Sequence, residues 1–206
     1  MRILVFGDSI AEGQWDTQGG WVERLRHDVT LLHLTNPSHD THLLNLSIGG
    51  NTTREVIDRL QSEVRARTYW LPPSEVALVF AVGVNDTVAS ADGRPALTIA
   101  EYGRQVRELH DAAAKLAETI IFVGLLPVDE HNPALKRLYR NERIWQFEQL
   151  LRAKTAALGC TFVPVYEVFL KGMHKGERLH SDGIHPNDNG HKLLYAAVKP
   201  ALERLF

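Results

Sequence analysis

Five short stretches of apolar, strand-forming residues recur along the chain, and each is bounded by glycine, proline or polar residues. Residues 3–6 form an unbroken run of this kind, which is typical of a strand buried on both faces of a parallel sheet. Residues 75–82 are the most apolar of the five and are the expected central strand. The other predicted strands are residues 42–46, 119–124 and 161–165.

Between the strands, apolar residues recur at a spacing of three and four, which is the period of an amphipathic helix. We predict helices at residues 21–34, from residue 52 onward, at 98–117, from about 138 to 158, and at 187–206. A glycine-rich turn is expected at residues 11–20 and an irregular, polar segment at residues 168–182. Strands that alternate with helices imply βαβ units, a parallel sheet and a three-layer α/β/α sandwich. Because the sequence shows no repeat or linker composition, we expect one domain over residues 1–206.

Composition and charge narrow the classes of function. The net charge is −2 with both signs interspersed, so the sequence predicts no basic face for nucleic acid. The longest apolar run, residues 76–84, has nine residues and is too short to span a bilayer. The single cysteine, Cys160, suits a reducing compartment, and no separate signal-peptide region precedes the first strand. We therefore expect a cytoplasmic protein without stable membrane association, and the sequence indicates no particular oligomeric state.

Glycine next to a small polar residue follows four of the five predicted strands. In an open parallel sheet the carboxyl ends of the strands lie along one edge, where ligands bind, so residues far apart in sequence can meet there. The four segments are residues 7–9, 49–51, 83–86 and 182–186.

Three residues of these segments provide the groups that nucleophilic catalysis needs. Ser9 supplies a hydroxyl that is a poor nucleophile by itself, His185 a base that can activate it, and Asp182 a carboxylate that can orient the base. Pro186 disfavours a helix at His185 and favours an extended backbone there. The simplest alternative for Ser9 is the cap of a helix or turn.

A metal site is the alternative interpretation of the histidines in this part of the chain. His180, Asp182, His185 and His191 would be its ligands. We do not expect it, because no cysteine or glutamate completes the set and His191 is expected on a helix. Asp8 and Asp86 are expected to bind loop amides.

These residues resemble the conserved blocks of the GDSL, or SGNH, hydrolase family. The chain is similar to that family at residues 7–10, 45–52, 83–86 and 182–186, and the blocks follow the family's order. The resemblance implies a flavodoxin-like sheet of five parallel strands in the order 2-1-3-4-5. It also implies that the reaction needs neither a cofactor nor a metal ion.

The resemblance assigns a role to each site residue. Ser9 would be the nucleophile, His185 the base and Asp182 the residue that orients it. The backbone N–H groups of Ser9 and Gly50 and the side-chain amide of Asn85 would form the oxyanion hole. Gly49 is the alternative to Gly50 if the register differs by one.

The expected function is hydrolysis of small-molecule carboxylic esters through an acyl-enzyme. The loops at residues 87–95 and 128–139 are the expected pocket walls; they are short and carry no long apolar lid, which favours small or short-chain acyl groups. The alternatives are removal of acetyl groups from a carbohydrate and, in a different class, a binding module that has kept the fold without turnover.

Overall fold

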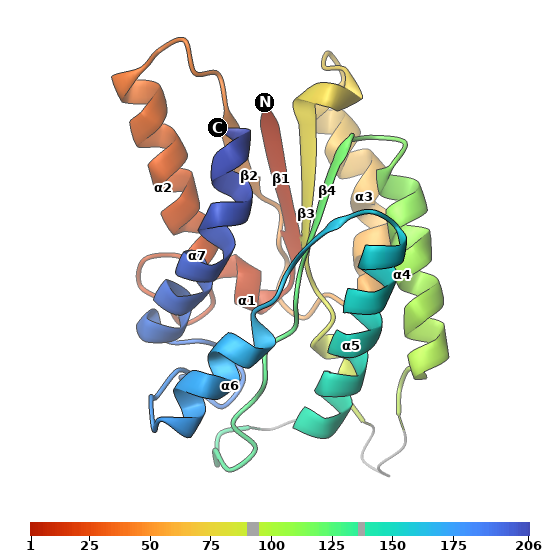
Figure 1. Cartoon of the computed structure of the whole chain (residues 1–206), viewed down its shortest axis with the longest axis vertical. Helices are drawn as coiled ribbons and strands as arrows, with labels where there is room; N and C mark the ends of the chain where they lie inside the picture. Colours follow the sequence, from red (N-terminus) through yellow and green to blue (C-terminus); the bar gives the residue numbers. More distant parts are fainter. Residues whose placement is uncertain (90–94, 136–138) are drawn as a thin grey trace.

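A five-stranded parallel sheet forms the centre of the protein, as the computed structural model of residues 1–89, 95–135 and 139–206 shows (Figure 1). The strand order is β2-β1-β3-β4-β5, which confirms the expected fold and order. Each pair of neighbouring strands is parallel. The strands are β1 (Arg2–Gly7), β2 (His42–Asn45), β3 (Val76–Ala81), β4 (Thr119–Val123) and β5 (Thr161–Val163).

Strands β1 and β3 are buried on both faces, as their unbroken apolar sequences predict. Phe6 of β1 lies beside Phe80 of β3, and Phe80 lies beside Phe122 of β4. The ring centroids of these neighbours are 6.0 and 5.2 Å apart. The core of the sheet is therefore held by a row of aromatic rings that crosses three strands.

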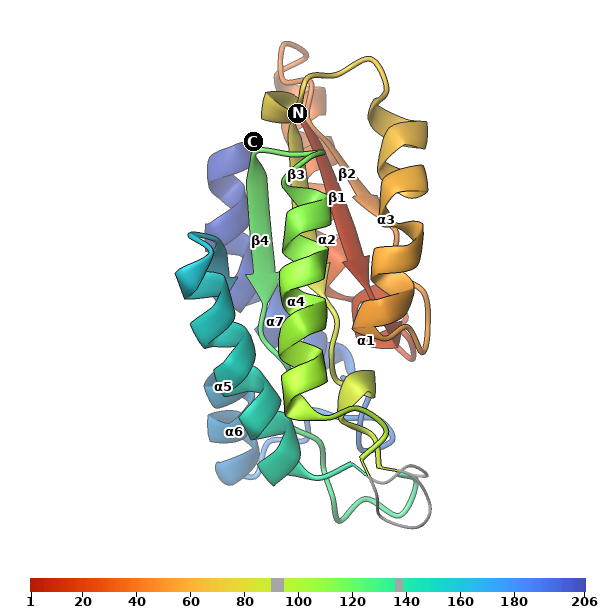
Figure 2. The ribbon, with the colours of Figure 1, turned by 90° about the vertical axis from the view of Figure 1, so that its right-hand side faces the viewer.

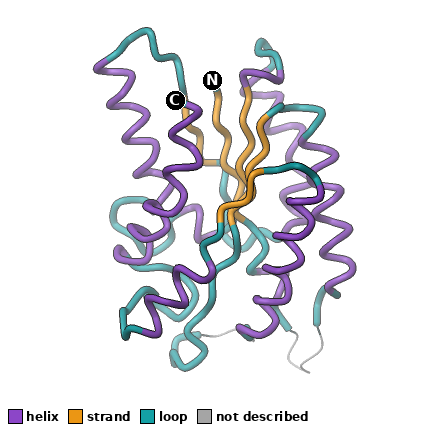
Figure 3. Tube along the Cα trace, in the orientation of Figure 1, coloured by secondary structure: helices purple, strands orange, loops and turns teal. Residues whose placement is uncertain are grey.

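Helices cover both faces of the sheet and make the three expected layers (Figures 1 and 3). One face carries α2 and α7, with the short α1 and α6 beside them, and the other carries α3, α4 and α5 (Figure 2). The predicted helices correspond to α2 (Gly20–Thr35), α3 (Thr53–Thr68), α4 (Ile99–Ala113), α5 (Asn141–Ala157) and α7 (Asp188–Leu202). The start expected for α5, at Leu138, lies outside the described residues.

Capping residues fix where two of these helices begin. Thr98 accepts a hydrogen bond from the backbone N–H of Glu101, and the Glu101 carboxylate accepts one from the backbone N–H of Thr98 at 2.8 Å. Thr52 and Glu55 form the same reciprocal pair at the start of α3. Such pairs satisfy backbone donors that a helix leaves free at its first turn.

Two short helices were not expected from the sequence. Helix α1 (Ser9–Glu12) begins before the predicted turn, and α6 (Tyr166–His174) occupies much of the segment predicted to be irregular. The expectation for α6 was wrong because its buried face is narrow: it consists of Tyr166, Phe169 and Gly172. Because Gly172 has no apolar side chain, the sequence does not show the regular spacing of apolar residues that predicts a helix. The remaining helical turns are η1 (Pro73–Glu75), η2 (Asn85–Thr87) and η3 (Glu203–Leu205).

Helix α5 carries a fully buried carboxylate, Glu148. One of its oxygens accepts the backbone N–H of Leu125 at 2.8 Å, and the other has no hydrogen-bond partner, although Arg152 lies 3.6 Å away. Gly124 makes room for it, since a Cβ there would lie 2.7 Å from the free oxygen. Burial raises the pKa of Glu148 to about 7, against its ordinary 4.5.

This raised pKa predicts that the free energy of unfolding falls as the pH rises. The folded protein holds a proton on Glu148 that the unfolded chain releases above about pH 4.5, so stability is highest below that pH and is lost as the pH rises through about 7. The loss from this group is about 3 kcal/mol at most. Glu148→Gln cannot ionise, so its stability relative to wild type should increase from pH 5 to pH 8 in urea denaturation. The exposed Glu142→Gln, on the same helix, is the control and should show no such trend. A constant difference for Glu148→Gln across this range would contradict the buried-acid account.

Candidate active site

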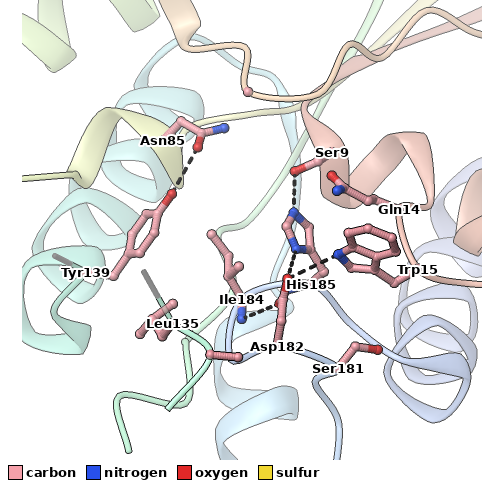
Figure 4. Close-up of a pocket in the computed structure, with 12 residues that line it drawn as sticks. Ser9, Gln14, Trp15, Asn85, Leu135, Tyr139, Ser181, Asp182, Ile184 and His185 are labelled. Carbon is pink, nitrogen blue, oxygen red and sulfur yellow. Dashed lines mark hydrogen bonds and ion pairs between the residues drawn. The ribbon is translucent and has the colours of Figure 1, made fainter. Parts of the chain in front are cut away.

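A cavity of about 680 Å³ lies at the carboxyl edge of the sheet, where the four glycine-rich segments meet (Figure 4). It combines polar groups from the beginning and the end of the chain with apolar side chains from the loop after β4. Its lining residues are Ser9, Gln14, Trp15, Gly50, Asn85, Ala134, Leu135, Tyr139, Ser181, Asp182, Ile184 and His185. Every residue predicted for the site therefore lines this cavity.

Ser9 is placed by the tight turn between β1 and α1. Asp8 caps the helix, with a side-chain oxygen that accepts the backbone N–H of Ile10 at 2.9 Å. Glycine is needed at position 7, because a Cβ there would lie 2.5 Å from the Cβ of Ala11 and 2.8 Å from the carbonyl oxygen of Ala81. The absent side chain lets α1 fold back against the end of the strand and present Ser9 to the cavity.

Ser9, His185 and Asp182 form a continuous hydrogen-bonded chain. The Ser9 Oγ lies 2.8 Å from His185 Nε2, and His185 Nδ1 lies 2.6 Å from Asp182 Oδ2 (Figure 4). Because a carboxylate only accepts hydrogen bonds, Nδ1 is the protonated nitrogen and Nε2 is free to accept the Ser9 hydroxyl. This is the arrangement in which an imidazole can take a proton from a serine.

The carboxylate of Asp182 is held by its own loop. Its Oδ1 accepts the backbone N–H groups of Ile184 at 3.2 Å and His185 at 2.9 Å. Burial alone would raise the pKa of Asp182, but the hydrogen bonds from the backbone and side chain of His185 and from Ile184 hold that pKa below its ordinary value. Asp182 is therefore ionised at neutral pH, as a group that stabilises an imidazolium must be.

Asn85 and Gly50 lie across the cavity from this chain. The hydroxyl of Tyr139 donates to Asn85 Oδ1 at 3.1 Å, and Asn85 Nδ2 donates to the carbonyl oxygen of Asn51 at 3.1 Å. These partners fix which end of the amide carries the N–H groups. Gly50 has a left-handed backbone with φ of 83° and lines the cavity. Gly49, the alternative, is not among the lining residues.

Asp8 and Asp86 are both buried and bind backbone amides, but these amides belong to the first turns of α1 and α3 and not to loops as expected. Asp86 accepts the backbone N–H of Thr53 at 3.0 Å and thereby joins the start of α3 to the loop after β3. Burial raises the pKa of Asp8 to about 7 and that of Asp86 to about 6. These carboxyl groups support the floor of the cavity and do not line it.

The residues considered as metal ligands were His180, Asp182, His185 and His191, and His185 and Asp182 bond to each other. His191 lies on α7, as expected, but is fully buried, and neither of its ring nitrogens has a hydrogen-bond partner. In the described parts of the chain, no group of three or more histidine, cysteine, aspartate and glutamate side chains is arranged to hold a metal ion.

One of the two expected pocket walls is confirmed. The loop at residues 128–139 contributes Ala134, Leu135 and Tyr139 to the cavity. None of the described residues of the loop at 87–95 lines it, and residues 90–94 lie outside the described part. Gln14 and Ile184 line the cavity without an individual role predicted from the sequence, and Tyr139 was predicted only as the end of a pocket-wall loop.

A family model, the GDSL-like Lipase/Acylhydrolase family, matches residues 5–193. The chain belongs to this family. It is therefore an ester hydrolase of the GDSL type. A comparison with curated protein sequences gave no match.

Solved structures resemble this GDSL hydrolase over nearly its whole length. TesA is 23% identical, with a TM-score of 0.73, and both chains are covered completely. A lipolytic protein of the G-D-S-L family from Veillonella parvula is 18% identical, with a TM-score of 0.76 and 99% of each chain covered. A variant of Axe2, an acetyl xylan esterase from Geobacillus stearothermophilus, is 21% identical, with a TM-score of 0.72, covering 99% of this chain and 94% of that one. At these identities the likeness concerns the fold.

No helix in residues 1–89, 95–135 and 139–206 combines the length and the apolar character needed to cross a bilayer.

The turn that places Ser9 predicts a sharp cost for a side chain at position 7. Gly7→Ala should lower the free energy of unfolding by about 1 to 3 kcal/mol, the usual cost of overpacking, because the added methyl group meets both α1 and the backbone of β3. Thermal unfolding measures this loss. Gly103→Ala in α4 is the control, since its Cβ would meet only the flexible ends of Leu150 and Lys154. Equal melting temperatures for the two variants would show that the turn tolerates a side chain.

Proposed function

We propose that this GDSL hydrolase is a serine esterase that forms an acyl-enzyme on Ser9. The observation that carries the proposal is the chain from Ser9 Oγ through His185 to Asp182, with separations of 2.8 and 2.6 Å, on the wall of a cavity large enough for a small ester. We further propose that residues 1–206 act as one domain, which is supported by a site that joins residues from both ends of the chain.

In the proposed reaction the Ser9 oxygen attacks the ester carbonyl and its proton passes to His185 Nε2. The ionised Asp182 stabilises the imidazolium that this transfer creates. As the tetrahedral intermediate collapses, the C–O bond to the alcohol breaks and His185 gives the proton to the leaving oxygen. A water molecule then repeats the sequence on the acyl-enzyme, which releases the acid and restores Ser9.

The negative charge of the intermediate needs donors on the opposite side of the carbonyl. We assign this role to the backbone N–H groups of Ser9 and Gly50 and to the side-chain amide of Asn85. Support comes from the position of all three residues on one cavity and from Tyr139, whose hydroxyl donates to the Asn85 oxygen and so identifies the other end of the amide as the donor. That nitrogen donates to the Asn51 carbonyl oxygen at 3.1 Å and lies 3.5 Å from the Asp8 carboxyl group. Donors fixed before the reaction lose little energy to reorganisation as the charge develops.

We propose a small acyl group for the substrate of the first candidate reaction. Leu135, Ile184 and the ring of Trp15 are among the apolar side chains of the cavity that would contact it. Removal of acetyl groups from a carbohydrate is the second candidate. It is favoured by Trp15, whose side chain is 64% exposed at the cavity and can pack on a sugar ring, and by the resemblance to an acetyl xylan esterase. Rates on nitrophenyl esters from acetate to octanoate, measured beside an acetylated xylose, distinguish the two.

The first test of the proposal is the reactivity of Ser9. A fluorophosphonate probe should label the wild-type protein once, and Ser9→Ala should abolish both the label and ester hydrolysis, as intact-mass spectrometry and a colorimetric ester would show. Ser181→Ala is the matched control, because Ser181 also lines the cavity; it should keep the label. A label that survives in Ser9→Ala would move the nucleophile elsewhere. Absence of any label or turnover in the wild type would favour the binding-module alternative.

The second test concerns Asn85. If its amide stabilises the oxyanion, Asn85→Ala should lower kcat by about 10² to 10³ while KM changes little. Asn85→Asp should be worse at pH 8, although it is nearly isosteric, because a carboxylate cannot donate to the developing charge. Steady-state kinetics on an acetate ester measure both values, and Asn36→Ala, an exposed site beyond α2, is the control.

Two outcomes would remove Asn85 from the proposed hole. One is an aspartate variant that keeps more activity at pH 8 than the alanine variant. The other is a pair of variants that melt well below the wild type while activity per folded molecule is unchanged, since Asn85 would then serve only the hydrogen bonds to Tyr139 and Asn51.

A further inference from the structure

Trp15 has an unfavourable backbone conformation next to the catalytic chain. Its φ is 67°, which makes it the only non-glycine residue with a positive φ in the part of the chain that the structure describes. This left-handed conformation costs a non-glycine residue about 1 to 2 kcal/mol, and strain of this kind points to a functional constraint when its surroundings enforce it.

The indole of Trp15 is directed at Asp182 and His185 (Figure 4). Its Nε1–H donates to Asp182 Oδ2 at 3.1 Å, and its ring meets the imidazole of His185 edge-on, with centroids 6.5 Å apart and planes at 80°. Oδ2 is also the oxygen that accepts His185 Nδ1–H. One carboxylate oxygen is thus shared between the imidazole and the indole.

The turn that carries Trp15 is anchored on two sides. The buried carboxylate of Asp16 accepts the backbone N–H of Gly20 at 2.8 Å and pairs with Arg24 of α2. Arg24 also donates to Asp188 at 2.7 Å, at the start of α7. Because α7 begins shortly after His185, the same ion-pair network fixes both the indole and the segment that carries the imidazole.

The position of Asp182 does not depend on Trp15. Two backbone N–H groups already hold Oδ1, and His185 itself holds Oδ2. What the indole adds is a second positive hydrogen atom beside the oxygen that faces the imidazole. We propose that this hydrogen bond weakens the hold of Asp182 on the imidazolium and so keeps His185 in its neutral, proton-accepting form at lower pH. The inference rests on the proposed function, in which His185 is the base.

The other titratable groups around His185 do not hide the effect of the indole on the protonation of His185. His180, on the same loop, and His191, on α7, lie close enough to influence it electrostatically. Burial lowers the pKa of both, to about 4 for His191, so neither carries charge near neutral pH. From α1, Glu12 places a carboxylate oxygen beside Gly49, where it would lie 2.9 Å from an added Cβ. Asp182 is therefore the charge in direct contact with the imidazole.

Replacement of the indole by a ring without a donor tests the proposal. Trp15→Phe should shift the acid limb of the kcat/KM profile, which rises to an alkaline plateau, to higher pH by about 0.5, a roughly three-fold change in proton affinity. Trp70→Phe, at an exposed tryptophan after α3, is the control and should leave the profile unchanged. A limb that moves to lower pH, or that does not move, overturns the proposal. A plateau that falls by two orders of magnitude also does so, because it would mean that the indole positions Asp182.

A readout without turnover separates this inference from the proposed function. Imidazole ring signals in NMR spectra, with those of His185 identified by their loss in His185→Gln, should titrate at higher pH in Trp15→Phe than in wild type. If this midpoint moves up in a protein that shows no serine-dependent hydrolysis, the inference stands and the proposed function fails. If hydrolysis depends on Ser9 but the midpoint does not move, the proposed function stands and the inference fails.

Discussion

The arrangement of the site depends on the pairing of β1 with a strand on each side. β2 and β3 both bond to its backbone in parallel register, and Ile3 to Phe6 are completely buried. A strand held in this way cannot slide without moving its whole apolar set, so its carboxyl end is a fixed point. Ser9 lies two residues beyond that end, and the neighbouring strands bring Asn51 and Asn85 to the same edge. The packing of the strands therefore determines where the polar residues lie, independently of the hydrogen bonds between them.

Packing beneath the site is tight enough to determine residue types. Gly7 has no room for a Cβ, and neither has Gly83, where it would lie 2.7 Å from the Tyr102 hydroxyl. Three buried carboxyl groups, those of Asp8, Asp86 and Glu148, lie near the carboxyl ends of β1, β3 and β4, with pKa values raised by burial to about 7, 6 and 7. They accept the backbone N–H groups of Ile10, Thr53 and Leu125 respectively. Burial of an acid is unfavourable, and these hydrogen bonds offset part of that cost while they fix the backbone next to the strand ends.

Much of this could be predicted from the sequence, because the features concerned are local or repeated. Long buried strands produce unbroken apolar runs, which located β1 and β3. Parallel strand ends collect small polar residues, which brought Ser9, Gly50 and Asn85 together on paper. Helix α6 was missed because a glycine completes its buried face. The contact of Trp15 with Asp182 was also beyond the sequence: it joins residues 167 positions apart and needs a left-handed backbone at a residue that rarely adopts one.

The two sides of the cavity are held by different residues, and the two sets of residues differ in their chemistry. On one side the loop before α7 binds Asp182 and His185, and the network of Asp16, Arg24 and Asp188 ties that loop to α2. On the other side Tyr139 and Asn51 hold the amide of Asn85. The first side carries the ionised carboxylate of Asp182, and both of its oxygens accept hydrogen bonds. On the second side the Asn85 amide nitrogen faces the carbonyl oxygen of Asn51 and, at 3.5 Å, the buried carboxyl group of Asp8, whose pKa burial raises to about 7. The residues that hold Asp182 and His185 differ from those that hold the Asn85 amide. A substitution that changes the proton affinity of His185 is therefore not expected to move Asn85.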